Sequence, residues 1–196
     1  MSQTPVISIV GWHNVGKTTF VIQLIKELKR RGLRIATIKH TRGDFDLDHE
    51  GTDTWRYSQA GSDVVAISGH GRLALLEQHL LEPNGELLLA DIVARLPPRL
   101  DLIITEGYKE AATPKIEIVA SCAERKRVSG AGELLAQVVG VSEMDHQGAA
   151  RPRHGTAQSG DQAGGQVPPG TPCFQMSEVA DIVDLLEARG LVPHKS

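Results

Sequence analysis

The chain has 196 residues, of which 40% are hydrophobic and 23% charged, so it is long and apolar enough to bury one core. This composition excludes a chain that is disordered throughout. The 21 basic and 24 acidic side chains give a net charge of -3, which argues against nucleic acid or an anionic membrane surface as a partner.

The first 40 residues follow the order strand, glycine-rich loop, helix, strand. Residues 6–10 form a continuous apolar run, which is typical of a strand buried on both faces of a parallel sheet. Apolar residues recur at helical spacing within 17–31, and residues 33–39 favour a second strand. These elements predict a βαβ unit.

Helices and strands continue to alternate through the rest of the chain. We expect helices near 54–60 and 86–96, a hairpin that pairs 63–68 with 72–77, strands at 100–105, 115–120 and 137–141, and a terminal helix capped by Ser177. Residues 145–172 hold six glycines and four prolines and only one aliphatic side chain larger than alanine. They are expected to form a flexible insertion, which leaves the whole chain, 1–196, as one domain.

Two features predict where the protein is found. The first residues lack a basic segment followed by an apolar run, and no apolar stretch approaches about 18 residues, so we expect a cytoplasmic protein without a membrane span. The two cysteines, Cys122 and Cys173, lie far apart and in no metal-ligand spacing. They are expected to be ordinary reduced thiols.

The octapeptide between the first strand and the first helix has the clearest chemical meaning. It reads Gly-Trp-His-Asn-Val-Gly-Lys-Thr at 11–18 and fits the phosphate-binding pattern G-x-x-x-x-G-K-[ST]. In such a loop, glycines let backbone N–H groups surround a phosphate, and the helix N-terminus adds partial positive charge. Lys17 is expected at the β and γ phosphates, Thr18 on Mg²⁺ and Thr19 near the α phosphate.

This motif, together with the order of the elements, predicts an α/β fold of the P-loop NTPase type, with a mostly parallel sheet flanked by helices. The predicted nucleotide-binding residues are Gly11, His13, Asn14, Val15, Gly16, Lys17, Thr18, Thr19 and Lys39. For His13 and Lys39, a position in solvent is the alternative.

Acidic residues after two of the predicted strands are candidates for the metal site. Glu106 follows the strand 100–105 at its C-terminal end, where ligands bind in parallel sheets, and we expect it to orient Mg²⁺ or its water. Asp46 and Asp48 are the preferred residues of the acidic stretch 44–50, with a hydrated loop as an equal alternative. The predicted metal ligands are therefore Thr18, Asp46, Asp48 and Glu106, with Glu106 and Asp46 as catalytic candidates.

Four segments resemble the molybdopterin-guanine dinucleotide biosynthesis protein B (MobB) family. They are the loop 11–18, Lys39-His40 with Phe45-Asp46-Leu47-Asp48, Gly-Thr-Asp-Thr-Trp-Arg-Tyr at 51–57 with Ala60-Gly61, and Ile-Ile-Thr-Glu-Gly-Tyr-Lys at 103–109 followed by Pro-Lys-Ile-Glu at 114–117. The resemblance spans about residues 6–120. It implies a GTP-binding homodimer, at most a slow Mg²⁺-dependent GTPase, that assists the guanylyltransferase joining GMP to molybdopterin.

The same resemblance implies a wider cleft for nucleotide and cofactor. It places Asp53, Arg56, Lys109 and Lys115 in or beside this cleft, where a phosphate such as that of molybdopterin suits the cations. For Arg56 and Lys109, a position in solvent is the equal alternative. The guanine base follows from the family alone, because no Asn-Lys-x-Asp element follows a late strand.

Two other functions fit the same phosphate loop. A small-molecule P-loop kinase needs an arginine-rich lid, for which Arg-Lys-Arg at 125–127 is the dense candidate. A metal-delivery GTPase is suggested by eight histidines, although they form no run.

Overall fold

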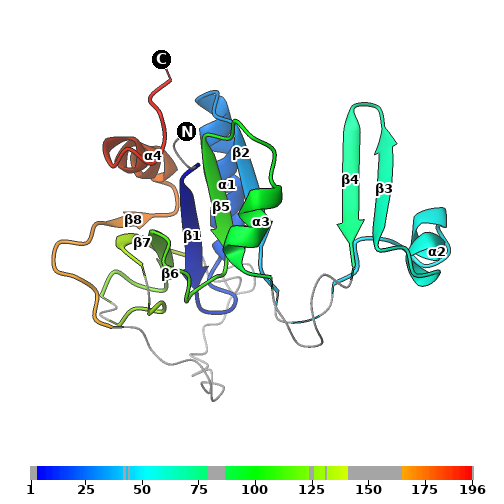
Figure 1. Ribbon diagram of the computed structural model, residues 1–196. Helices are drawn as coiled ribbons and strands as arrows, with labels where there is room; N and C mark the ends of the chain where they lie inside the picture. Colours follow the sequence, from blue (N-terminus) through cyan, green and yellow to red (C-terminus); the bar gives the residue numbers. More distant parts are fainter. Residues whose placement is uncertain are drawn as a thin grey trace, which may run out of the picture. The chain divides into compact units, whose positions relative to one another are not determined.

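The computed structural model describes residues 4–41, 43, 45–78, 87–123, 126–130, 132–140 and 165–195 (Figure 1). The chain divides into two compact units, the first formed by 1–40 and 97–196 and the second by 41–96. The second unit is thus an insertion in the sequence of the first. Whether both act as the single expected domain stays a prediction.

The first unit is built on a six-stranded parallel sheet with the order β2-β5-β1-β6-β7-β8. Its strands are β1 (Val6–Gly11), β2 (Ile35–Lys39), β5 (Leu102–Glu106), β6 (Lys115–Val119), β7 (Leu134–Val139) and β8 (Cys173–Gln175). This architecture confirms the predicted fold class. Because all strands are parallel, the carboxyl ends of β2, β5 and β1 share one edge of the sheet.

Two amphipathic helices, α1 (Lys17–Arg30) and α4 (Val179–Ala188), pack together in the core of this unit. The fully buried side chains that they contribute are Phe20, Leu24 and Leu28 from α1 and Ile182, Val183 and Leu186 from α4. They join alternate residues of β1, β5 and β6 in one cluster, and each contributes about 1.5–3 kcal/mol by leaving water. Within the described ranges, no helix is long and apolar enough to cross a bilayer.

The second unit contains α2 (Asp53–Gln59), the antiparallel strands β3 (Val64–Gly69) and β4 (Arg72–Glu77), and α3 (Leu89–Arg95). His70 and Gly71 form the hairpin turn with φ of 47° and 73°, the left-handed conformation that two-residue hairpin turns require. α2 packs against β3, where Val65 is buried. The predicted hairpin and its turn are confirmed, whereas α3 begins later than expected, at Leu89.

The C-terminal part of the sheet differs from the expectation in three details. β7 begins at Leu134, three residues before the predicted start at Gln137, and β8 was not predicted. Helix α4 has Glu178, not Ser177, as its N-cap residue, and no side chain caps it. The Glu178 carboxylate instead accepts a hydrogen bond from the backbone N–H of Gln175 at 2.6 Å, which holds the end of β8 beside the helix.

The expectation of two reduced thiols is wrong, because Cys122 and Cys173 form a disulfide with a Cα–Cα distance of 6.0 Å. Cys122 follows β6 and Cys173 begins β8, so the bond joins the edge of the sheet to the segment after β6. Of the expected insertion 145–172, residues 145–164 lie outside the described residues. Among the last eight, Gly165 O accepts a backbone hydrogen bond from Arg127 N–H and Pro172 O accepts one from Gln137 N–H, both at 2.9 Å. The expected flexibility of the insertion stays a prediction.

Removing this disulfide is expected to destabilise the first unit. The two cysteines are 51 residues apart, and closing a loop of that length stabilises a fold by about 4 kcal/mol in the chain-entropy model, with about 2–4 kcal/mol typically measured. We expect Cys122→Ser to lower the free energy of unfolding by about 2–4 kcal/mol, measured by urea denaturation. The Cys122→Ser/Cys173→Ser double variant should lose no more than the single variant. Full stability of the single variant would contradict the bond.

Candidate functional site

The phosphate loop connects β1 to α1 at the carboxyl edge of the sheet (Figure 1). Asn14 and Gly16 have φ of 58° and 89°, in the left-handed region, which is how a loop gathers successive N–H groups into an anion-binding nest. Gly16 is the N-cap of α1 and no side chain caps this end, so the first N–H groups of the helix are left for a ligand. His13 and Thr19 are exposed, and Val15 is half-buried.

Two close backbone contacts hold the loop from the side of β6 and β7. A Cβ on Gly11 would lie 2.6 Å from the carbonyl oxygen of Ile118 in β6. A Cβ on Gly140, the residue after β7, would overlap the carbonyl oxygen of Val15 inside the loop. Only glycine fits at either position, so β6 and the end of β7 together fix where the loop lies.

The Gly140→Ala substitution should therefore disturb the phosphate loop and spare the rest of the sheet. The added methyl group has to displace Val15, and we expect at least a tenfold loss of nucleoside triphosphate affinity with circular dichroism unchanged. The Gly165→Ala variant is the control, because a Cβ there meets nothing within 4 Å. Equal affinities for the two variants would show that the Gly140 contact has no effect on binding.

Lys17 lies folded back over the loop, with its Nζ donating a 2.6 Å hydrogen bond to the carbonyl oxygen of Trp12. Burial lowers the pKa of Lys17. The Glu106 carboxylate opposes this effect, and the charges of Lys109 and Lys39 reinforce it. Among the described residues, the ammonium group of Lys17 therefore feels the positive charges of Lys109 and Lys39 and the negative charge of Glu106. Gathered lysine side chains of this kind favour a bound polyanion.

At the end of β5, Glu106 contacts one other residue of the predicted metal site, Thr18. Its two carboxylate oxygens accept the Thr18 hydroxyl at 3.0 and 3.1 Å, and Oε1 lies 3.7 Å from Lys39 Nζ. The β2–β5 register places Lys39 and Glu106 side by side. Because the Thr18 hydroxyl donates its hydrogen to the carboxylate, the lone pairs of the Thr18 oxygen can face a cation. A hydroxyl and a carboxylate at the mouth of a phosphate loop are the oxygen donors that suit Mg²⁺.

After Glu106 the chain turns back sharply over the same edge. Gly107 and Tyr108 have φ of 105° and 54°, and a Cβ on Gly107 would lie 3.1 Å from the Cβ of His40. The ring of Tyr108 contacts the ring of His40 with centroids 4.8 Å apart. This turn places Lys109 Nζ 5.0 Å from the centroid of the Trp12 ring, in a cation–π contact with the phosphate loop.

The remaining acidic candidates belong to the second unit and are described within it. Asp48 accepts hydrogen bonds from the Thr52 hydroxyl and the backbone N–H of His49, both at 2.8 Å, just before α2. Hydrogen bonds, first of all that from Thr54, lower the pKa of Asp48. Asp48 therefore has a local structural role at the start of α2. That Asp48 and the exposed Asp46 hold Mg²⁺ stays a prediction.

The two other candidates on α2 form a weak surface pair. Arg56 lies 3.8 Å from Asp53 one turn away, and their side chains are 67% and 82% exposed. Such pairs contribute little to stability, so both side chains are open to a ligand. Their contact with a second phosphate stays a prediction.

Lys115 is placed differently from the exposed cations. It is fully buried, and its Nζ donates to the carbonyl oxygens of Ala111 and Thr113, the latter at 3.2 Å. Burial lowers its pKa to about 8. The structure thus gives Lys115 the role of holding the segment after the Gly107 turn, and its predicted phosphate contact stays untested.

Within the described residues, the structure does not show the features that the rival functions need. The guanidinium of Arg127, in the lid expected for a kinase, donates to Ser129 Oγ and the Gly132 carbonyl oxygen, both at 3.1 Å, which leaves it as a structural residue. Arg125 lies outside the described residues. Among the residues that the structure describes, no three His, Cys, Asp or Glu side chains converge as a metal site.

Sequence reasoning missed Trp12, His40, Tyr108 and Gly140 as parts of the site. Trp12 occupies a variable position of the motif, so the pattern assigns it no role. His40 and Tyr108 follow shortly after predicted strands. Their position at the sheet edge could have been predicted from this alone. Gly140 gave no signal in the sequence, because the contact that excludes a side chain there is with Val15, which is far away in sequence.

Comparison with known proteins gives a consistent set of matches. The sequence model of the family described as "Molybdopterin guanine dinucleotide synthesis protein B" matches residues 6–140. A Haemophilus influenzae protein named "Molybdopterin-guanine dinucleotide biosynthesis adapter protein" is 34% identical over 115 residues, which cover 59% of this chain and 63% of that protein. An Escherichia coli protein of the same name is 35% identical over 113 residues, or 57% and 63% of the two chains. The chain thus spans about 63% of the length of these relatives.

Solved structures show the same fold. The crystal structure of Bacillus subtilis MobB matches with a TM-score of 0.60 and 24% identity over 96% of this chain and 98% of that one. A MobB homologue from Bacillus stearothermophilus matches with a TM-score of 0.56 and 22% identity over 94% and 96% of the two chains. At these identities, the likeness establishes the fold alone.

Proposed function

Because the chain belongs to the molybdopterin guanine dinucleotide synthesis protein B (MobB) family, we propose that it binds GTP with Mg²⁺ as an accessory protein of molybdenum cofactor biosynthesis. In this role it assists the guanylyltransferase that attaches GMP to molybdopterin, and it hydrolyses GTP slowly at most. The observation that carries the proposal is the phosphate loop, whose Thr18 hydroxyl is bonded to the Glu106 carboxylate. Family membership supports the role in cofactor maturation.

Each residue of the site has a separate task in this proposal. The N–H groups of the loop and of the first turn of α1 bind phosphate oxygens, and Lys17 exchanges the Trp12 carbonyl for the β and γ phosphates. Thr18 and Glu106 hold Mg²⁺, which neutralises charge on the phosphates when bound. Lys39, paired with Glu106 at 3.7 Å, adds positive charge at the same edge.

The choice of guanine rests on the family, because residues 141–164, where a base-reading loop is expected, lie outside the described part of the chain. Titration calorimetry with GTP, ATP, CTP and UTP, each with Mg²⁺, tests this part directly. We expect GTP to bind at least tenfold more tightly than the others. Equal affinities for the four nucleotides would contradict guanine specificity. The absence of heat with all four would contradict nucleotide binding.

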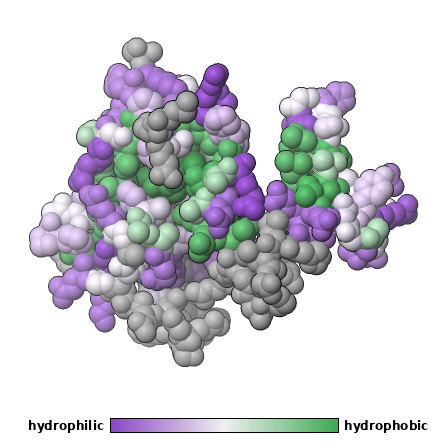
Figure 2. Space-filling model, in the orientation of Figure 1, coloured by the Kyte–Doolittle hydropathy of each residue, from purple (hydrophilic) through white to green (hydrophobic). Residues whose placement is uncertain are grey.

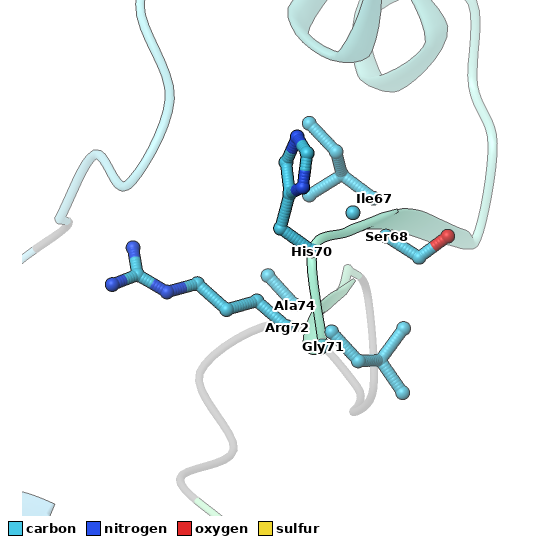
Figure 3. A pocket seen from close by; sticks show the side chains of 8 residues that line it. Ile67, Ser68, His70, Gly71, Arg72 and Ala74 are labelled. Carbon is cyan, nitrogen blue, oxygen red and sulfur yellow. The ribbon is translucent and has the colours of Figure 1, made fainter.

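The proposal also includes a homodimer, formed through the hairpin β3–β4. Large apolar side chains are exposed on both faces of this hairpin, with Ile67 on one face and Val64, Leu73 and Leu75 on the other, at 49–66% exposure. They gather on the hairpin in Figure 2, and residues 67–74 line a surface hollow at its turn, where Figure 3 shows Ile67 beside His70. A two-stranded hairpin is only marginally stable alone, and a second copy supplies a self-complementary apolar partner.

Charged residues on the hairpin should therefore give a monomer. We expect Leu73→Glu/Leu75→Glu to sediment as a monomer at concentrations where the unaltered chain is a dimer, because two carboxylates would be buried in the interface. Ile22→Glu is the control, since Ile22 is 48% exposed on the outer side of α1. A dimeric double variant would rule out the hairpin as the interface, and a monomeric unaltered chain would rule out the homodimer.

The accessory role needs a test of its own. Co-purification of the unaltered chain with the molybdenum cofactor guanylyltransferase, in the presence of GTP and Mg²⁺, is the expected result. If the two proteins stay separate in every nucleotide state, the assisting role fails while nucleotide binding remains open to the calorimetric test. Molybdopterin itself is a proposed ligand, and the co-purification should be repeated with molybdopterin added.

A further inference from the structure

The cation–π contact between Lys109 and Trp12 connects two segments that the phosphate-binding motif does not link. Trp12 is the second residue of the phosphate loop, and its side chain is 38% exposed. Lys109 comes from the turn after β5 and lies with its ammonium nitrogen 5.0 Å from the ring centroid. A flat ring of this kind attracts a cation over its face without neutralising its charge. Lys109 is thus held beside the phosphate loop.

The turn that delivers Lys109 is tightly determined. Both Gly107 and Tyr108 adopt positive φ, which is costly for tyrosine, and the contact of Tyr108 with the His40 ring fixes the turn against the end of β2. Backbone strain of this kind persists where surrounding contacts enforce it. The contacts of Tyr108 and Trp12 therefore place the Lys109 side chain from both sides.

The charges of Lys109 and Lys17 act on each other beside the loop. The charge of Lys109 acts directly on Lys17, as does that of Lys39, and Glu106 is the carboxylate that opposes them. The side chains of three lysines therefore bring positive charge to the side of the loop where Glu106 lies. Lys17 is the residue that meets the β and γ phosphates in loops of this pattern, so a cation in its vicinity lies near the terminal phosphate.

We propose that Lys109 is a second terminal-phosphate contact, positioned by the Trp12 ring, which lets the protein distinguish a nucleoside triphosphate from a diphosphate. The inference rests on the proposed nucleotide binding and goes beyond it, because it assigns Lys109 to the terminal phosphate of the nucleotide and gives the Trp12 ring the task of positioning it. Lys109 contacts the phosphate, and Trp12 is a positioning residue that acts through Lys109. No covalent step is involved.

The test uses the full chain and measures GTP and GDP affinities, each with Mg²⁺, by calorimetry. We expect Lys109→Met to weaken GTP binding about tenfold or more and GDP binding less than about twofold, since a lost contact to a charged group acts only where the third phosphate is present. Lys109→Arg should restore most of the GTP affinity. Lys26→Met removes an exposed lysine of α1 and is the matched control for the loss of charge.

Trp12 supplies a second, independent arm. Trp12→Leu should lose about threefold in GTP affinity, and Trp12→Phe, which keeps a π face, should stay close to the unaltered protein. In a Trp55→Phe background Trp12 is the one tryptophan left, since the chain has two, and its fluorescence should change more with GTP than with GDP. Thermal unfolding of each variant checks that the fold is intact.

The two ideas fail in different ways. If the unaltered chain binds neither nucleotide, the proposed function and this inference fall together. If it binds both nucleotides and Lys109→Met weakens them equally or not at all, only this inference is overturned. The positioning role of Trp12 is overturned if the Leu and Phe variants behave alike.

Discussion

Lys17→Ala is expected to lower the affinity for Mg²⁺-bound GTP by at least about a hundredfold, with the melting temperature within a few degrees of the unaltered protein. The side chain lies outside the buried cluster that α1 forms with the sheet, and among the described residues its ammonium group donates to the Trp12 carbonyl oxygen. Its removal therefore costs little in folding. In the nucleotide complex, the same ammonium group faces the phosphates, which carry most of the ligand charge. Its removal is therefore expected to lower the nucleotide affinity and not the stability of the fold.

A matched control exists on the same helix. Lys29 also donates to a backbone carbonyl, that of Leu33 at 2.9 Å, and lies near the far end of α1. Lys29→Ala thus removes a similar side chain and a similar hydrogen bond, and we expect its GTP affinity to stay within about twofold. Calorimetric titration of both variants gives the comparison. Unaltered affinity of Lys17→Ala would show that the loop does not bind phosphate in the proposed manner.

The central elements of the fold were predictable because each has a local signal. The apolar run of β1, the glycine loop and the amphipathic period of α1 follow one another without interruption, and the structure confirms all three. The hairpin was equally predictable from its turn at 69–71. Such elements depend on residues that are close in sequence, so the spacing of apolar residues and the residue types of the turn are enough to predict them.

The elements that were missed depend on contacts distant in sequence. β8 has only three residues, too few for an alternating pattern, and its place is set by β7 and by the disulfide from Cys122. Cys122 and Cys173 gave no signal because a pairing cannot be deduced from spacing alone. Ser177 suits a helix N-cap, yet the helix begins one residue later, where Glu178 bonds to the end of β8.

For the candidate site, the residues of the phosphate loop and Glu106 were predictable from the motif and from the rule that ligands bind at the carboxyl ends of parallel strands. The residues that hold the loop and Glu106 in place were not predictable. Trp12, Tyr108 and Gly140 act through contacts between loops that the sheet brings together, and those contacts follow from strand order. A β1 strand between β5 and β6 cannot be read from composition or periodicity.

Glu106→Gln should have the second large effect, on Mg²⁺ rather than on the phosphates. The carboxylate can only accept from Thr18, at 3.0 and 3.1 Å, so the hydroxyl hydrogen points toward Glu106 and the oxygen lone pairs are left for a cation. A glutamine keeps the shape but removes the charge, and its NH₂ group can donate to Thr18 and occupy a lone pair. We expect the Mg²⁺ concentration for half-maximal GTP binding to rise about tenfold or more, and any slow hydrolysis to fall by a similar factor.

GTP binding measured without Mg²⁺ separates this effect from a general loss of the site. Without the metal, Glu106→Gln should bind GTP at least as tightly as the unaltered protein, because one negative charge facing the phosphates is gone. Lys17→Ala should lose affinity with or without Mg²⁺. Glu133→Gln is the control, since Glu133 pairs with Arg189 at 2.6 Å just before β7 begins. If the Mg²⁺ dependence and the hydrolysis rate of Glu106→Gln match those of this control, Glu106 does not serve the metal, and another acid has to be sought in the stretch that holds Asp46 and Asp48.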